Sequence, residues 1–354
     1  MDQQQRAKSN ITSNMDKNLV VNPTISVVMP VYNSGQFLNQ AIESILDQTY
    51  TDYEFIIIND GSTDDTESLI LSYSDSRIKY FKNSANLGIV ASLNKGIELA
   101  SGKFLARMDA DDVSLRERFE KQLHFMESNP EIAACGSQAF YINIMGIKIG
   151  QSSLPVQDDD IKARLLFRNT FIHPSTFFRT KIVKEIGYNP DYHYAEDYYL
   201  LAQISRKHSV GNLCDPLLLY RIHDGNTTAT KKKEMMMSHL KVLDYQISFF
   251  LNKKTDTQFL AEFYALAEHD FQAYDLSVYI NVLKLLLKTN IEKKSYDPQT
   301  FHRILHLNWY ELLRKKGGKH ALLHFLRSDL SSRNDITFKQ IRSIFKTSLK
   351  SLFH

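Results

Sequence analysis

The chain has 354 residues, 43% of them hydrophobic, and its formal net charge is only +3. This length suits two domains better than one, and the apolar fraction is enough for a sizeable core; with so balanced a charge we expect no nucleic-acid partner. Only two cysteines occur, Cys135 and Cys214, in no C-x-x-C pattern, which argues against a disulfide framework or zinc ribbon and favours a reducing compartment.

The N-terminal segment, residues 1–22, is polar and has no long apolar run. It is not a secretory signal, and we expect a disordered lead-in. No uninterrupted apolar stretch of about 18 residues follows, so the sequence predicts no transmembrane helix. Together these features predict a cytoplasmic protein.

Strand-like and helix-like segments alternate strictly through the first third of the chain. Buried strands are expected over 25–29, 54–58, 77–81 and 103–108, and helices over 36–48, 64–73 and 89–100. Such alternation predicts an α/β fold with a mostly parallel sheet flanked by helices. Ligands of these sheets bind at the carboxyl ends of the strands.

Polar clusters stand at those strand ends. They are Tyr32-Asn33, Asn59-Asp60-Gly61-Ser62, Asn86-Leu87-Gly88 and Asp109-Ala110-Asp111-Asp112. From about residue 131 the pattern is mixed, with strands near 132–141, 176–179 and 217–222 and a helix near 195–207. Beyond residue 231 only helical repeats occur. The sequence therefore predicts a catalytic domain over 23–230 and a helical C-terminal region over 231–354.

The acidic cluster Asp109-Ala110-Asp111-Asp112 is the first candidate for chemistry. Carboxylates at positions i and i+2 after a strand can converge on one Mg²⁺ or Mn²⁺, which in turn grips a diphosphate. The alternative is an acidic loop that caps a helix starting near Ser114. Because the chain has no G-x-x-x-x-G-K-[ST] and no G-x-G-x-x-G, a metal is the natural means of holding phosphate.

Three further clusters carry possible roles. Asp60 can accept hydrogen bonds from a base or ribose, although its segment also suits a simple turn. Glu196-Asp197 opens a Tyr-rich helix, where acidic residues either favour the helix dipole or supply a general base. His173 is a structural or functional histidine, His223 is a possible ligand of metal or phosphate, and Arg221 could grip phosphate.

Taken in order, these motifs resemble glycosyltransferase family 2. The resemblance covers roughly residues 24–230 and rests on Pro30-Val31-Tyr32-Asn33, Asn59 to Asp64, Asn86-Leu87-Gly88, Asp109 to Asp112, Glu196-Asp197 and Tyr220-Arg221-Ile222-His223. The family implies a GT-A fold, a nucleotide-sugar donor (here most simply UDP-linked), a divalent cation (Mn²⁺ or Mg²⁺) and inversion at the anomeric carbon.

The resemblance also implies roles for individual residues. Pro30 and Tyr32 would line the uracil and ribose region, and Asp60 would contact the base. Asn86 and Asp109 would belong to the donor site, with Asp109 at the ribose. Asp111 and His223 would ligate the metal, Asp197 would be the catalytic base, and Glu196 would help to bind the acceptor.

The chain lacks the Q-x-x-R-W signature of processive synthases, so non-processive transfer to a surface glycan (lipopolysaccharide, capsule or exopolysaccharide) is favoured. Two alternatives remain at this stage. One is a sugar-phosphate nucleotidyltransferase, although the Gly-rich loop with Arg and Lys is missing after the first strand. The other is an inactive homologue that acts as a membrane assembly scaffold.

The tail differs in charge from the rest of the chain. Residues 1–230 carry 22 basic and 28 acidic side chains, a net charge of −6, whereas residues 231–354 carry 21 and 12, a net charge of +9. Residues 338–353 place Phe338, Ile341, Ile344, Phe345, Leu349 and Leu352 on one helical face and Lys339, Arg342, Lys346 and Lys350 on another. This pattern suits an anionic membrane surface, here the inner face of the cytoplasmic membrane, or packing within the tail.

Overall fold

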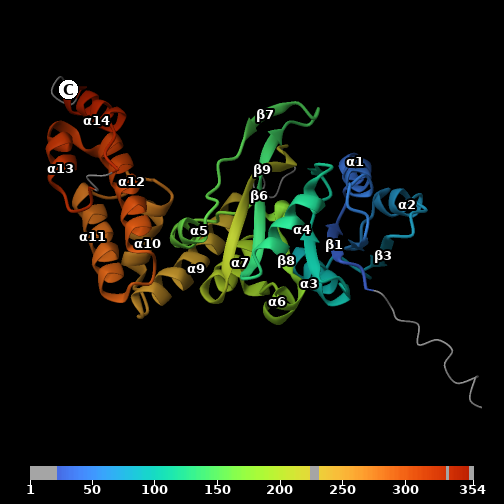
Figure 1. Cartoon of the computed structure of the whole chain (residues 1–354). Helices are drawn as coiled ribbons and strands as arrows, with labels where there is room; N and C mark the ends of the chain where they lie inside the picture. Colours follow the sequence, from blue (N-terminus) through green and yellow to red (C-terminus); the bar gives the residue numbers. More distant parts are fainter. Residues whose placement is uncertain (1–21, 224–230, 332–334, 351–354) are drawn as a thin grey trace, which may run out of the picture.

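The computed structural model describes residues 22–223, 231–331 and 335–350. Its centre is a nine-stranded sheet, with the helical tail at one end and the first strands at the other (Figure 1). The predicted leader, 1–22, lies almost entirely outside the described residues. The first elements are β1 (Ile25–Val31), α1 (Gly35–Leu46), β2 (Tyr53–Asn59), α2 (Thr66–Leu71), β3 (Ile78–Lys82), α3 (Ile89–Leu99) and β4 (Phe104–Arg107).

The middle of the chain completes the sheet. Its elements are β5 (Val113–Ser114), α4 (Arg118–Ser128), β6 (Ile132–Ile142), β7 (Lys148–Gln151), α5 (Asp158–Leu165), η1 (His173–Ser175), β8 (Phe177–Arg179), α6 (Thr180–Ile186), η2 (Pro190–Tyr192), α7 (Glu196–Lys207) and β9 (Ser209–Arg221). The strands run in the order β3-β2-β1-β4-β8-β6-β9-β5, and β7 pairs with β6.

The sheet is mixed rather than mostly parallel. β3, β2, β1 and β4 pair in parallel, as the alternating pattern predicts, and β6 pairs in parallel with β9. By contrast, β8 lies antiparallel between β4 and β6, and β5 and β7 are also antiparallel to their partners. A strand as short as β8 gives no periodicity from which its direction could be predicted.

Every residue of β1 and β2 is buried, because helices cover both faces of the sheet. Val27 and Met29 pack with α1 and α4 on one face, whereas Val28 packs with α3 on the other. Gly102 is required here by a close approach, since a Cβ at this position would lie 2.6 Å from the backbone nitrogen of Ser26.

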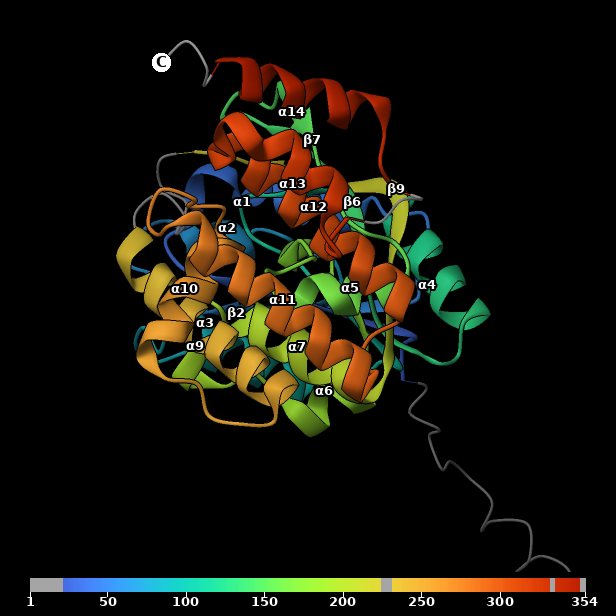
Figure 2. The same ribbon diagram turned by 90° about the vertical axis from the view of Figure 1, so that its left-hand side faces the viewer.

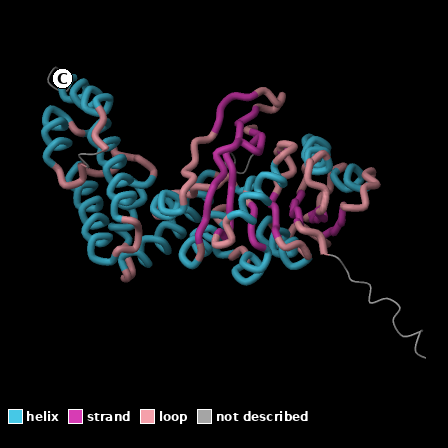
Figure 3. The backbone as a smooth tube through the Cα atoms, viewed as in Figure 1, coloured by secondary structure: helices cyan, strands magenta, loops and turns pink. Residues whose placement is uncertain are grey.

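The tail is helical throughout its described part (Figures 2 and 3). It contains α9 (Lys232–Leu251), α10 (Thr257–Ala267), α11 (Leu276–Lys293), α12 (Pro298–Lys316), η3 (Gly318–His320), α13 (Ala321–Arg327) and α14 (Phe338–Lys350). Its apolar residues share one continuous core with α5 and α7, so the tail packs directly on the sheet-bearing part. None of the helices in the described ranges is both long and apolar enough to cross a bilayer.

Candidate active site

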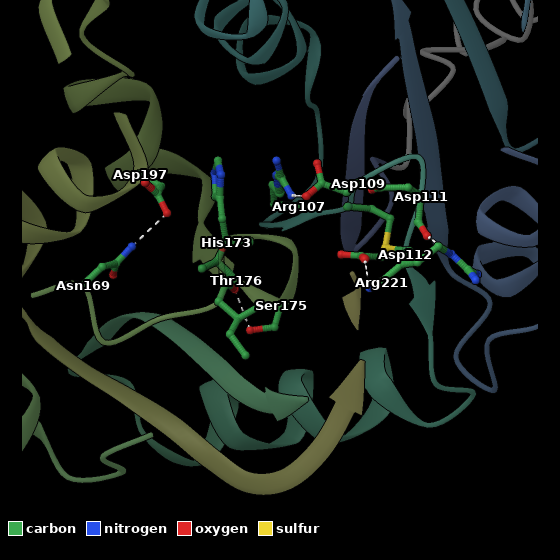
Figure 4. Close-up of polar contacts among 12 residues, drawn as sticks. Arg107, Asp109, Asp111, Asp112, Asn169, His173, Ser175, Thr176, Asp197 and Arg221 are labelled. Carbon is green, nitrogen blue, oxygen red and sulfur yellow. Dashed lines mark hydrogen bonds and ion pairs between the residues drawn. The ribbon is translucent and has the colours of Figure 1, made fainter. Parts of the chain in front are cut away.

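A cavity of about 550 Å³ opens beside the end of β4. Its walls come from elements far apart in sequence: the segment after β4, η1, the start of α7 and the end of β9. In Figure 4, His173 and Arg107 lie between Asp197 on one side and the carboxylates of Asp109 and Asp111 on the other. Of the polar clusters predicted at strand ends in the first third of the chain, the one after β4 lines this cavity.

Three carboxylates meet at one edge of this cavity. Asp109, Asp111 and Asp112 each offer an oxygen atom, and these three atoms lie within 4.8 Å of one another. Asp112 is buried and accepts a hydrogen bond of 2.8 Å from the backbone N–H of Arg221, while its Oδ2 has no hydrogen-bond partner among the described residues. Burial, together with the charges of Asp109 and Asp111, raises the pKa of Asp112 well above its ordinary value. Such a group is suited to a cation.

The residues after this cluster do not form the helix that the alternative interpretation required. Val113 and Ser114 form strand β5, which pairs with β9, and the next helix begins at Arg118. The acidic cluster is therefore separated from that helix by a strand and a turn. Capping of α4 does not explain the three carboxylates.

Arg107 is a site residue that the sequence analysis did not select. It is the last residue of β4, is buried, forms an ion pair with Asp109 and lines the cavity. Its Nε has no hydrogen-bond partner within the described ranges. A charged residue at the end of a fully buried strand was the available signal, because such a charge needs a partner or a ligand.

Arg221 holds the acidic cluster in place from behind. The side chain is 1% exposed; its Nε donates to the backbone oxygen of Asp111 at 2.7 Å, and one terminal nitrogen donates to Gln40 at 2.7 Å. These bonds argue against the predicted role of Arg221 in gripping phosphate. Nearby, Nε2 of His223 lies 3.0 Å from Oδ2 of Asp111, so both predicted metal ligands stand together.

Glu196 and Asp197 begin α7 on the opposite side of the cavity. Asp197 accepts hydrogen bonds from the side chain of Asn169 at 2.8 Å and from the backbone N–H of Tyr198 at 2.7 Å. Burial raises the pKa of Asp197. Glu196 is also buried, and desolvation together with the charge of Asp197 raises its pKa to about 7. Its Oε2 makes no hydrogen bond to any described residue.

His173 lines the cavity between these two acidic groups. Its Nε2 lies 2.7 Å from the hydroxyl of Tyr188. Burial, with a smaller contribution from the positive charge of Arg107, lowers the pKa of His173 well below 6.5. A neutral imidazole held by Tyr188 can exchange hydrogen bonds with a ligand but adds no charge.

Four residues predicted to bind the nucleotide sugar, Pro30, Tyr32, Asp60 and Asn86, do not line this cavity. Asp60 is 4% exposed and accepts hydrogen bonds from Asn83 at 2.7 Å and from the backbone N–H groups of Leu87 and Gly88 at 2.9 and 2.8 Å. It therefore fixes the loop that contains Asn86. Gly61, at φ +73°, lets this loop approach, because a Cβ there would lie 2.6 Å from the Ala85 carbonyl carbon.

The other two of these residues, Pro30 and Tyr32, lie at the end of β1. Pro30 lies inside the strand and is buried, and Tyr32 follows the strand with its side chain half-exposed. The next residue, Asn33, accepts a hydrogen bond of 2.9 Å from the backbone N–H of Thr63. The first two sequence motifs are therefore joined directly.

The fold and the site define an α/β enzyme whose acidic cluster follows a central strand. The family model for glycosyl transferase family 2 matches residues 26–187. An uncharacterized glycosyltransferase of Haemophilus influenzae is 36% identical over 243 residues, which span 65% of this chain and 75% of the relative. The O-antigen biosynthesis glycosyltransferase WbnJ of Escherichia coli is 33% identical over 68% of this chain and 94% of its own length.

The chain belongs to glycosyltransferase family 2 and is a glycosyltransferase. The structure of S. aureus TarS 1-349 in complex with UDP-GlcNAc has a TM-score of 0.56 and 16% identity, and the match covers 92% of both chains. This likeness confirms the GT-A-type fold with a helical C-terminal region. Family membership leaves the nucleotidyltransferase alternative without support.

Proposed function

We propose that this enzyme transfers a single sugar, with inversion, from a UDP-linked donor to a hydroxyl group of a surface glycan. One observation carries the proposal: Asp109 and Asp111, two of the three clustered carboxylates, line the same cavity as Asp197. The complex of the structural neighbour with UDP-GlcNAc supports a UDP donor. The O-antigen role of the Escherichia coli relative supports a surface glycan, such as lipopolysaccharide, as the acceptor.

The acidic cluster fits a divalent cation. Hard oxygen ligands suit Mn²⁺ or Mg²⁺, and the partnerless Oδ2 of buried Asp112 is the kind of atom that a cation satisfies. Asp111 would hold the ion, with His223 beside it and with Asp109 and Asp112 completing the oxygen donors. The ion would supply positive charge to the departing diphosphate.

The protein's own groups then perform the transfer. Asp197 takes the proton of the acceptor hydroxyl as its oxygen attacks the anomeric carbon, and the bond from this carbon to the diphosphate breaks. Asn169 orients the carboxylate of Asp197 through the 2.8 Å hydrogen bond. Because attack and departure occur on opposite faces of the sugar, a single displacement inverts the anomeric configuration.

A screen of nucleotide sugars tests the proposal. The expected result is slow release of UDP from one donor in the presence of Mn²⁺, strongly reduced by EDTA. Asp215 is an exposed acidic residue outside the site. The variant Asp215→Ala serves as the control for Asp111→Ala, because it should leave the release of UDP unchanged. Release that does not depend on a cation, or a preference for a donor without UDP, would contradict the proposal.

We also propose that α14 holds the enzyme on an anionic membrane, the inner face of the cytoplasmic membrane. The stripe expected on one face divides in the structure: Ile344 is buried against the tail, whereas Phe338 is 80% exposed and Phe345 and Leu349 are also exposed. Lys339, Arg342 and Lys346 are exposed as well. Leu352 lies outside the described residues. Each basic residue near such a surface contributes on the order of 1 kcal/mol.

The β6–β7 hairpin supports a membrane-facing side. Its turn exposes Ile144, Met145 and Ile147, and β7 exposes Ile149. No acidic residue occurs from Tyr141 to Gln151. In Figures 1 and 2, β7 and α14 both lie toward the top of the molecule.

Flotation with liposomes that contain anionic lipid tests this localisation. We expect the full chain to float and the double variant Phe345→Gln/Leu349→Gln to float less. Leu71→Gln on α2, which removes an even more exposed apolar side chain, should behave like the full chain. Equal flotation of all three proteins would refute the role of α14. The variant that ends at Asn334 provides a second comparison.

A further inference from the structure

A second cavity, of about 380 Å³, also has Asp197 in its lining. It shares Tyr194, Asp197 and Met235 with the cavity described above. Of the three clustered carboxylates, Asp109 and Asp111 line the first cavity, and none lines the second. Asp197 therefore lines two adjoining cavities, one of which contains Asp109 and Asp111 and one of which does not.

The helical tail builds much of the second cavity. Met236 and His239 of α9 line it together with Tyr264 of α10 and Glu268, the residue that follows α10. Nδ1 of His239 lies 3.1 Å from a carboxylate oxygen of Glu268. The backbone oxygen of Ala267 accepts a hydrogen bond of 2.9 Å from Arg168 in the sheet-bearing part. The first contact joins α9 to the residue after α10, and the second joins the end of α10 to the sheet-bearing part.

The lining combines flat apolar surfaces with a few hydrogen-bonding groups. Tyr194, Tyr264 and the methionine side chains supply the apolar surfaces. Glu268 is ionised at neutral pH, because its hydrogen bond with His239 lowers its pKa, and it can accept hydrogen bonds from hydroxyl groups. Aromatic rings beside carboxylates suit a sugar, whose C–H face is apolar and whose edge carries hydroxyls.

The charges of the cavity favour a neutral ligand. Asp197 and Glu268 are the carboxylates of the lining, and His239 is already paired with Glu268. The remaining cation is Lys232, whose side chain is exposed at the rim. A phosphate or carboxylate group deep in the cavity would therefore face two carboxylates, which costs free energy in a partly desolvated site.

We infer that this cavity binds the acceptor, that the acceptor sugar is an uncharged pyranoside, and that the helical tail is the acceptor-recognition element. The inference rests on Asp197 as the general base of the proposed function. The acceptor hydroxyl reaches Asp197 from the second cavity, while the donor's anomeric carbon approaches from the first. The tail, which the family model does not cover, thereby gains a function in the reaction.

Two neighbouring methionines on α9 provide a matched test. Met236 lines the cavity and is 43% exposed, whereas Met237 does not line it and is 49% exposed. Both positions are exposed enough to accept a larger side chain without disturbing the core. Met236→Trp should raise the KM for a neutral acceptor at least about tenfold, a loss of about 1.4 kcal/mol of binding. Met237→Trp should leave it unchanged.

Two further measurements separate this inference from the proposed function. Donor hydrolysis without acceptor should be the same in both variants and in the original chain, because Met236 lies outside the donor cavity. Saturation-transfer NMR with methyl glycosides of neutral hexoses and N-acetylhexosamines should detect binding to the original chain and to Met237→Trp, and at least about tenfold weaker binding to Met236→Trp.

The contrary results are equally defined. An unchanged acceptor KM in Met236→Trp, equal loss of hydrolysis and transfer, or no binding of any neutral glycoside would overturn the inference. Tighter binding of a glycoside 6-phosphate than of its neutral parent would overturn the assignment of an uncharged acceptor. If the original chain hydrolyses no nucleotide sugar but the NMR measurements give the expected glycoside binding, the assignment of this cavity as a glycoside site is supported and the proposed function is refuted.

Discussion

Replacing Glu196 with glutamine should stabilise the folded protein at alkaline pH far more than at acidic pH. Glu196 is buried at the start of α7, beside the charge of Asp197, and both effects raise its pKa to about 7 from 4.5. Arg107 and the backbone N–H groups at the helix start oppose this rise only in part. The ionised form of this carboxyl is therefore disfavoured in the folded state.

The size of the effect follows from the difference between the pKa of 4.5 in the unfolded chain and the pKa of about 7 in the folded protein. Below pH 4.5 the carboxyl is protonated in both states; between pH 4.5 and about 7 it ionises in the unfolded chain only. The original protein thus loses stability as pH rises through this range, by about 1.4 kcal/mol for each pH unit. Glutamine has no such ionisation. Between pH 5 and pH 8 the stability of Glu196→Gln should gain about 3 kcal/mol relative to the original chain.

Thermal unfolding at pH 5 and pH 8 measures this gain. For domains of 150–250 residues, 1 kcal/mol shifts Tm by roughly 2–4 °C, so we expect the two Tm differences to diverge by about 5 °C or more. Glu185→Gln, which alters an exposed carboxylate on α6, is the control and should show little divergence. The same Tm difference at both pH values would refute the reasoning for Glu196.

Three other variants test the proposed roles. Asp111→Ala should abolish transfer and weaken Mn²⁺-dependent binding of UDP in calorimetry, and unchanged turnover would remove Asp111 from the mechanism. Asp197→Asn should lower kcat by about 10² or more while UDP and Mn²⁺ affinities remain; lost donor affinity with normal turnover would instead make Asp197 a donor-binding residue. Arg221→Lys should weaken Mn²⁺ binding about tenfold or more through its contact with Asp111, and an unaltered metal titration would contradict that contact's importance.

The first half of the fold was predictable because its strands are buried on both faces. Continuous apolar runs such as Phe55–Ile58 mark central parallel strands, and polar residues directly after them mark the ligand-binding edge. The structure of the segments after Asp112 was harder to predict from the sequence. β5 has two residues, and β7 has four, all of them exposed, so that neither strand adds a buried apolar run. Their positions depend on pairing with β9 and β6, which no local pattern specifies.

The composition of the site divides in a similar way. Asp109, Asp111, Glu196 and Asp197 stand in short motifs and could be selected from the sequence. Arg107 stood out only as a charge at the end of a buried strand, and its role follows from the ion pair with Asp109, which forms inside the fold. The second cavity could not be predicted from the sequence either, since Met236 and Tyr264 belong to helices whose sequence pattern predicts only burial of an apolar face. Contacts between distant segments decide such sites.

The electrostatics of the cavity connect the acidic cluster with the proposed base. Asp109, Glu196 and Asp197 all have raised pKa values, chiefly because burial disfavours their ionised forms, and the charges of neighbouring carboxylates raise those of Asp109 and Glu196 further. Arg107 is the cation that opposes this effect for all three. A base must be ionised to accept a proton, so a raised pKa leaves less of Asp197 in its active form. A divalent cation at the clustered carboxylates would lower the pKa of Asp197 through its charge, and so would couple donor binding to the activation of the base.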